Sequence, residues 1–175
     1  MQSKKSLLTI TYTAIFTTMI VLATSVLKFS TGLGEGYIHL GDSVIYLAAC
    51  LLPFPYCLIA GALGGALADI ISGFAIWSIP TMIIKMLNIL PFALICKKYK
   101  SIKILSKQTA LITVVSGIVT ILGYFIAECI LYSVASATLS LIGNTIQAVA
   151  SGIIFIVIAK SLDKINLKSK LSKGA

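Results

Sequence analysis

Apolar residues in this chain occur in six runs that are separated by short polar or glycine-rich segments. The runs cover approximately residues 7–27, 41–52, 56–74, 79–96, 109–132 and 138–159. A spanning helix needs about 20 apolar residues, so the first run and the last three are long enough. The second run is short and ends at a turn forced by Pro53 and Pro55, so we expect its polar start at Gly41 and Asp42 to lie within protein. The pattern predicts an all-α membrane protein, a bundle of six transmembrane helices.

Composition supports lipid as the solvent of this chain. Of its 175 residues, 58% are hydrophobic and 11% are charged, and the mean hydropathy is +1.05. Soluble domains are about half apolar and about a quarter charged. We therefore expect residues 1–175 to form a single integral membrane domain.

Lysines predict the orientation of the spans. All 14 cationic residues are lysines, and they give a net charge of +9. Twelve of them cluster before the first run, between the fourth and fifth, and after the sixth: Lys4, Lys5, Lys97, Lys98, Lys100, Lys103, Lys107, Lys160, Lys164, Lys168, Lys170 and Lys173. Cytoplasmic loops carry an excess of lysine and arginine, so six spans with both termini in the cytoplasm satisfy the rule. Placement at segment ends and the lack of arginine argue against nucleic acid as a partner.

The longest connection on the predicted outer face joins the first and second runs. It reads KFSTGLGEGYIHLGD and interleaves glycines with Glu35, Tyr37 and His39. Glycine permits sharp turns, so this loop could cover a pocket and bring acid, phenol and imidazole groups to a ligand. The alternative is a mobile, solvated loop.

Three ionisable residues, Asp69, Lys85 and Glu128, interrupt the apolar runs. A charge at the centre of a spanning helix costs roughly 2.5–3.5 kcal/mol, so such residues are usually functional. Asp69 lies eight positions before Trp77 and Lys85 eight positions after it, which places both at roughly 12 Å along adjacent helices. We expect a structural ion pair between them, although Lys85 could also contact a ligand.

Further polar residues fall at the same depth. Tyr124 precedes Glu128 by four positions, Asn144 precedes Gln147 by three, and Asn88 follows Lys85 by three. Polar groups that converge with aromatic ones in an apolar site are typical of a small-molecule pocket. The predicted ligand-binding residues are Glu35, Tyr37, His39, Trp77, Lys85, Asn88, Tyr124, Glu128, Asn144 and Gln147. As alternatives, Trp77 could anchor at the membrane interface, and the amides could join helices.

Motifs of catalysis and metal binding are missing from the sequence. It contains no GxxxxGK[ST], HExxH or GxSxG motif, one histidine, and four cysteines without paired spacing. We therefore expect no enzyme activity, no metal and no cofactor. An outward-facing pocket without an energy source suggests a subunit of a larger assembly.

The stretch from Tyr37 to Leu90, the short second run and the chain length carry a family resemblance. The chain resembles the substrate-binding S components of energy-coupling factor (ECF) vitamin transporters, and within them the hydroxymethylpyrimidine-, pyridoxine- and pantothenate-type subgroup. The resemblance implies a multi-pass protein of a bacterial plasma membrane that holds a water-soluble vitamin under its first loop. It also implies a membrane coupling protein and two cytoplasmic ATPases as partners. The family's AxxxA docking motif corresponds here to Ala14 and Thr18.

The sequence thus predicts a subunit that captures a water-soluble vitamin or precursor at the outer face for ATP-driven uptake. Glu128 suggests a cationic or amine-bearing ligand, whereas an unpaired Lys85 would suggest an acid or a phosphate. Two other functions stay open: a structural or assembly membrane protein, and a small stand-alone transporter.

Overall fold

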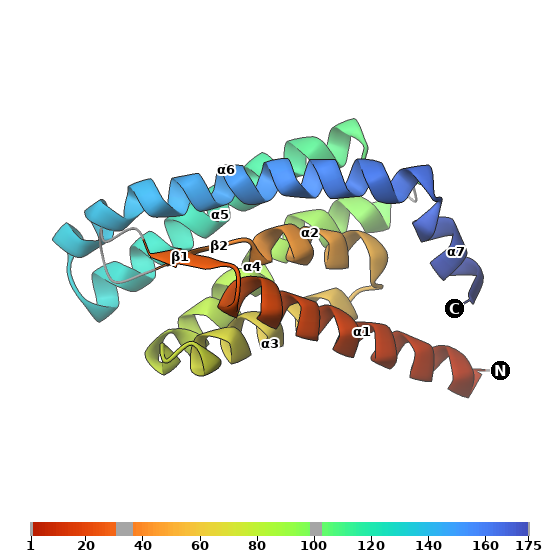
Figure 1. The fold of residues 1–175 in the computed structure, drawn as a ribbon, viewed down its shortest axis with the longest axis horizontal. Coiled ribbons are helices and arrows are strands. Elements are labelled where there is room, and N and C mark those ends of the chain that lie inside the picture. Colours follow the sequence, from red (N-terminus) through yellow and green to blue (C-terminus); the bar gives the residue numbers. More distant parts are fainter. Residues whose placement is uncertain (1, 31–36, 99–102, 175) are drawn as a thin grey trace.

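A computed structural model describes residues 2–30, 37–98 and 103–174 as a bundle of helices (Figure 1). The elements follow one another as α1 Gln2–Ser25, β1 Lys28–Ser30, β2 Tyr37–His39, α2 Gly41–Leu51, α3 Tyr56–Ile71, the 3-10 helix η1 Ala75–Trp77, α4 Ser78–Lys98, α5 Lys107–Leu131, α6 Val134–Lys164 and α7 Leu167–Gly174. Each predicted apolar run corresponds to one of the helices α1 to α6. The expected all-α membrane fold is confirmed.

The helices differ in their ability to cross a bilayer. Four segments are long and apolar enough, namely Ser6–Ser25, Ala75–Cys96, Lys107–Leu131 and Val134–Lys164, whereas α2 and α3 are shorter apolar helices. Helix α2 packs against α1, α3, α4 and α6, and its residues from Gly41 to Cys50 are buried. The short second helix therefore lies inside protein, as its polar start required.

Two elements were not predicted. The connection after α1 contains an antiparallel pair of short strands, in which Phe29 lies opposite Ile38. The chain also continues past α6 into α7, which follows a residue with positive φ, Asn166. Both elements are short, and neither leaves a long periodic signal in the sequence.

Glycines on α3 allow close contacts between helices. A Cβ on Gly65 would lie 2.9 Å from Thr81 Cγ2 and 3.0 Å from Lys85 Cγ, so α4 approaches α3 where α3 has no side chain. One position earlier, a Cβ on Gly64 would lie 2.7 Å from Ile20 Cγ2 on α1. The small-residue pattern of α3 thus serves contacts on two sides inside the bundle.

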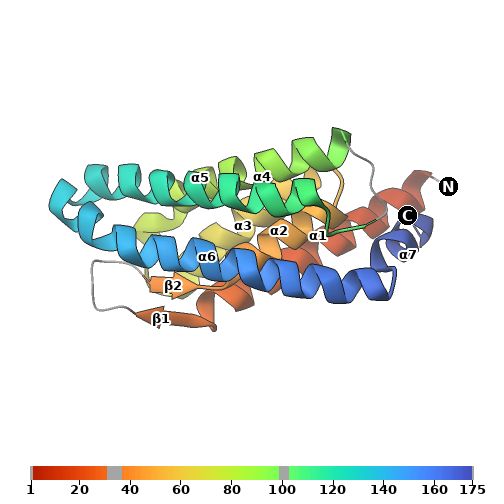
Figure 2. The ribbon, with the colours of Figure 1, turned by 90° about the horizontal axis from the view of Figure 1, so that it is seen from above.

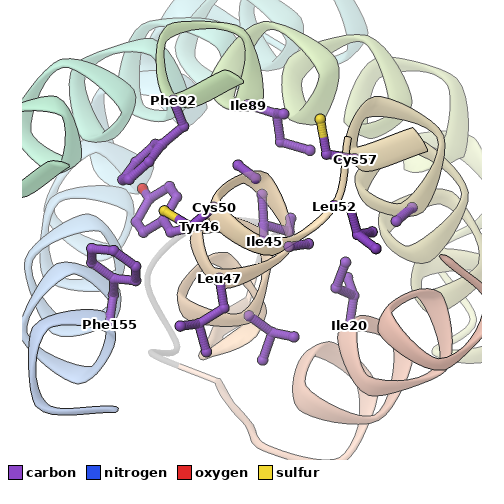
Figure 3. Close-up of a cluster of buried hydrophobic side chains, with 14 of the residues drawn as sticks. Ile20, Ile45, Tyr46, Leu47, Cys50, Leu52, Cys57, Ile89, Phe92 and Phe155 are labelled. Carbon is purple, nitrogen blue, oxygen red and sulfur yellow. The ribbon is translucent and has the colours of Figure 1, made fainter. Parts of the chain in front are cut away.

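An aromatic and aliphatic core surrounds α2 (Figure 3). The rings of Tyr46 and Phe92 stack at 4.8 Å between centroids, and Phe155 meets Phe92 edge-on at 5.4 Å. Phe92 and Phe155 belong to the halves of α4 and α6 that lie nearer the lysine-rich end. Apolar packing therefore dominates that half of the bundle, whereas the ionisable residues Asp69, Lys85 and Glu128 lie in the opposite halves of their helices.

The start of α1 and the end of α7 lie at the same end of the bundle in both views (Figures 1 and 2). The exposed Lys160 and Lys164 lie near this end. The positive-inside rule predicts that this end lies in the cytoplasm. The β1–β2 pair and the turn between α5 and α6 then face the outside.

Candidate ligand-binding site

A pocket opens near the end of the bundle opposite the termini. The volume of its cavity is about 50 Å³, which is smaller than the range of about 300–1,000 Å³ usual for small-molecule sites, so a ligand of that size requires the pocket to widen. Side chains from β2, the α3–η1 region, α4, α5 and α6 surround it: His39, Asp69, Phe74, Trp77, Thr81, Tyr124, Glu128, Ser140, Asn144 and Gln147. Segments far apart in the sequence thus meet at one hollow that combines aromatic and polar groups.

Six of the ten predicted ligand-binding residues line this pocket. They are His39, Trp77, Tyr124, Glu128, Asn144 and Gln147. Lys85 and Asn88 are buried outside its lining, and Glu35 and the side chain of Tyr37 lie outside what the structure describes. Their role in binding stays a prediction, but the polar depth inferred from sequence corresponds to a real concave site.

Glu128 is held across the α5–α6 hairpin. Its side chain is 2% exposed, and its Oε1 accepts hydrogen bonds from Ser136 Oγ at 3.0 Å and Ser140 Oγ at 2.7 Å. Both hydroxyls come from the first turns of α6. The two bonds fix the carboxylate at the pocket wall with Oε1 engaged, so a donor in the pocket would meet Oε2.

Trp77 lies in the wall of the pocket and not at the surface of the bundle. It is 8% exposed, and its ring lies 5.9 Å from the ring centroids of both Tyr124 and Tyr132. Within the described residues, its Nε1–H has no hydrogen-bond partner. The interpretation of Trp77 as an interface anchor is therefore wrong, because such anchors face the lipid headgroups.

The expected ion pair between Asp69 and Lys85 is also wrong. Lys85 Nζ lies 2.5 Å from Asp42 Oδ1, and both side chains are almost completely buried. Equal depth on neighbouring helices does not make two side chains face each other, because each helix can be rotated about its axis. Lys85 extends over Gly65 toward the first turn of α2, whereas Asp69 lines the pocket.

Gln147 connects this ion pair to the strand above it. Its Nε2 donates to Asp42 Oδ2, and its Oε1 accepts from the backbone N–H of His39, each at 3.2 Å. A buried network thus runs from Lys85 on α4 through Asp42 and Gln147 to β2. Because Gln147 and His39 also line the pocket, this network forms part of its floor.

His39 is a neutral, structural part of the floor. Its Nδ1 accepts a hydrogen bond from the N–H of Gly41 at 3.1 Å. Burial, followed by the positive charge of Lys85, lowers the pKa of His39 from 6.5 to about 3. The imidazole is therefore uncharged at neutral pH, with its proton on Nε2.

Asn88 joins helices and does not reach the pocket. Its Nδ2 donates to Thr120 Oγ1, and its backbone oxygen accepts from Ser116 Oγ at 2.8 Å. Both partners lie on α5. Its residue type also allowed this helix-joining role, and the expectation that Asn88 contacts a ligand stays a prediction.

Sequence reasoning missed four residues of this region. Phe74, Thr81 and Ser140 line the pocket, and Asp42 neutralises Lys85 beneath it. Ser140 had a usable signal, because it precedes Asn144 by four positions on the same helical face. Thr81 precedes Lys85 by the same interval, and its hydroxyl lies 3.2 Å from Tyr124 Oη.

Among the described residues, no group of three or more His, Cys, Asp or Glu side chains is arranged to hold a metal ion. The acidic groups of the pocket are Asp69 and Glu128. With its aromatic walls, this arrangement can bind a flat molecule through stacking and hydrogen bonds.

Comparison with known proteins gives two matches. A family model described as "ECF-type riboflavin transporter, S component" matches residues 4–164, from α1 to the last residue of α6. A protein of Pyrococcus woesei, described as "Uncharacterized protein in gap 3'region", is 31% identical over 135 residues, which is 77% of this chain and 87% of that protein. The family description names riboflavin, so the narrower resemblance to the hydroxymethylpyrimidine, pyridoxine and pantothenate subgroup is not supported.

Proposed function

Because the chain belongs to the family of S components of ECF-type transporters, we propose that its pocket captures a water-soluble vitamin or vitamin precursor. An S component is the substrate-binding subunit of the transporter and not an enzyme, and it is a multi-pass protein of the cell membrane. The pocket opens toward the outside, so the vitamin would enter from the medium. The single observation that carries this proposal is the hollow lined by Glu128, Trp77 and Asn144 at the end opposite the lysines.

The proposed partners follow from the family. ECF transporters combine an S component with a membrane coupling protein and two cytoplasmic ATPases, and we expect the same module here. Ala14 and Thr18 are exposed on α1, where a coupling protein could reach them. The chain alone should therefore bind its vitamin but should not complete net uptake.

Two observations suggest which vitamin the protein binds. The family description names riboflavin, and the resemblance of the Tyr37–Leu90 stretch favours hydroxymethylpyrimidine, pyridoxine or pantothenate. All four compounds belong in one binding panel. Their chemistry differs enough for the pocket to discriminate among them.

The test is a thermal-shift measurement on the purified protein in detergent with each vitamin. A ligand at 100 times its Kd stabilises the folded state by about 2.7 kcal/mol, which is a measurable shift of the melting temperature. We expect at least one compound to give such a shift. If the protein is folded and none of them does, the proposed function is refuted.

Two variants test whether this pocket is the site. Glu128→Gln and Asn144→Ala should each weaken binding and leave the expression level unchanged. Thr145→Ala is the matched control, because Thr145 follows Asn144 on α6 but is exposed and bonds to Leu141 O. Loss of expression with normal affinity per folded molecule would favour the alternative of a structural or assembly protein.

A further inference from the structure

Trp77 offers the pocket a hydrogen-bond donor. Its Nε1–H is buried and lacks a partner among the described residues, although its ring is packed against Tyr124 and Tyr132. Buried donors are normally satisfied, and one that lines an open pocket calls for an acceptor on the ligand. A ring nitrogen or a carbonyl oxygen would fill this role.

Glu128 offers an acceptor. The hydrogen bonds that it receives from described residues both reach Oε1, which leaves Oε2 for the ligand. Asn144, half-buried in the same wall, has no bond to any described residue and can donate as well as accept. A ligand that satisfies Glu128 must present an N–H or O–H group, and the bond is stronger when one partner is charged.

Aromatic side chains determine the shape of the ligand. Three aromatic side chains line the pocket. Trp77 belongs to η1, Phe74 directly precedes η1, and Tyr124 belongs to α5. Aromatic groups pack best against flat rings in offset or edge-on arrangements. A flat ligand would therefore bury more surface here than a flexible chain of equal size.

The charges of the site select against acids. Asp69 and Glu128 both line the pocket, whereas the ammonium of Lys85 is engaged by Asp42. The remaining described cation nearby is Lys28, whose Nζ lies 5.9 Å from the ring centroid of Phe74. A carboxylate or phosphate in the pocket would face the like charge of Glu128, whose described partners are the uncharged hydroxyls of Ser136 and Ser140.

We propose that the ligand is a flat nitrogen heteroaromatic that directs an N–H group to Glu128 and an acceptor to Trp77, and that carries no acidic group. This inference rests on the proposed function, since it names the chemical class of the captured vitamin. Riboflavin and the amino-substituted hydroxymethylpyrimidine both belong to this class. Pantothenate, a flexible carboxylate, does not.

The experiment measures Kd values by calorimetry with the full chain in detergent. The probes are riboflavin, amino-hydroxymethylpyrimidine and pyridoxamine, each beside its N-methylated form, together with flavin mononucleotide, pyridoxamine phosphate and pantothenate. For the parent that binds, we expect N-methylation or phosphorylation to weaken binding at least tenfold. Pantothenate should bind at least a hundredfold more weakly than that parent.

Variants separate the two recognition groups. Glu128→Gln should reduce the preference for the parent over its N-methylated form at least fivefold, because the charged acceptor is lost. Trp77→Phe keeps an aromatic ring and removes the donor, and it should weaken binding of the parent at least tenfold. Tyr132→Phe, which keeps the ring that contacts Trp77 and lies outside the lining, is the control and should leave Kd unchanged.

The outcomes are distinct. Tight binding of pantothenate or of a phosphorylated form, or equal binding of the N-methylated compound, would overturn this inference and leave the proposed function intact. Unchanged preference in Glu128→Gln would overturn it too. Absence of binding by every probe, with the protein folded, would refute the proposed function itself.

Discussion

Replacing Asp42 with asparagine removes the carboxylate that neutralises Lys85 at the centre of the bundle. Lys85 is 1% exposed and Asp42 is 0% exposed, so neither water nor lipid headgroups can take over the lost interaction. Breaking a buried ion pair by removing one partner costs about 3–5 kcal/mol, because the other charge stays buried. We expect Asp42→Asn and Lys85→Met each to lower the free energy of unfolding by about this amount.

The double variant Asp42→Asn/Lys85→Met removes both charges and should be closer in stability to the wild type than either single variant. The coupling energy should therefore exceed about 3 kcal/mol, since the double variant loses less than either single variant. Thermal unfolding of the four proteins in one detergent measures it, with Lys160→Met as the control. Lys160 is exposed, so its replacement should change stability by no more than about 0.5 kcal/mol. Single variants as stable as the wild type, or a double variant whose loss equals the sum of the two, would refute the pairing.

Three further predictions concern the floor and the helix contacts. Gln147→Leu should speed deuterium exchange at the His39 amide in the ligand-free protein, since the bond to Gln147 Oε1 is lost; unchanged exchange would show that β2 is held by other contacts. The pKa of His39 falls to about 3 on folding, so its stabilising contribution is complete above pH 6.5 and is lost toward pH 3. His39→Asn should therefore reduce the pH dependence of the free energy of unfolding over this range by up to about 1.4 kcal/mol per pH unit. Parallel profiles of the variant and the wild type would contradict the prediction. Gly65→Ala should cost about 1–3 kcal/mol through crowding against Thr81 and Lys85, and a melting temperature equal to that of the wild type would show that α4 can shift.

The sequence was informative where a property depends on position along a helix. Runs of apolar residues predicted α1 to α6, and lysine clusters predicted the end of the bundle where the termini lie. Glu128, Asn144 and Gln147 fall on the two long helices α5 and α6, whose depth can be counted from a short turn. These three residues line the pocket, as expected from that count.

The direction in which a side chain points depends on the rotation of its helix about the helix axis, and this could not be predicted from position along the chain. Short elements could not be predicted in this way either. The sequence predicts Asp69 as the partner of Lys85, because the two residues lie at the same depth on neighbouring helices. The actual partner is Asp42, at the start of α2, a helix too short to be placed by its length. The β1–β2 pair contains three residues in each strand, which gives no usable alternation. Asn88 and Gln147 are chemically similar, and only the structure separates the one that joins helices from the one that lines the pocket.

The short length of α2 explains why a pocket exists at this place. Its 11 residues extend about 16 Å, roughly half of the hydrocarbon thickness of about 30 Å. The aromatic core packs around α2 in the half nearer the termini, where Tyr46, Phe92 and Phe155 meet. In the outer half, a full-length central helix would fill the space between α3, α5 and α6. Because α2 begins only at Gly41, that space is closed from below by Asp42 and Gln147 and from the side by β2. The same feature that leaves α2 unable to span the membrane therefore creates the hollow in which a ligand can be held.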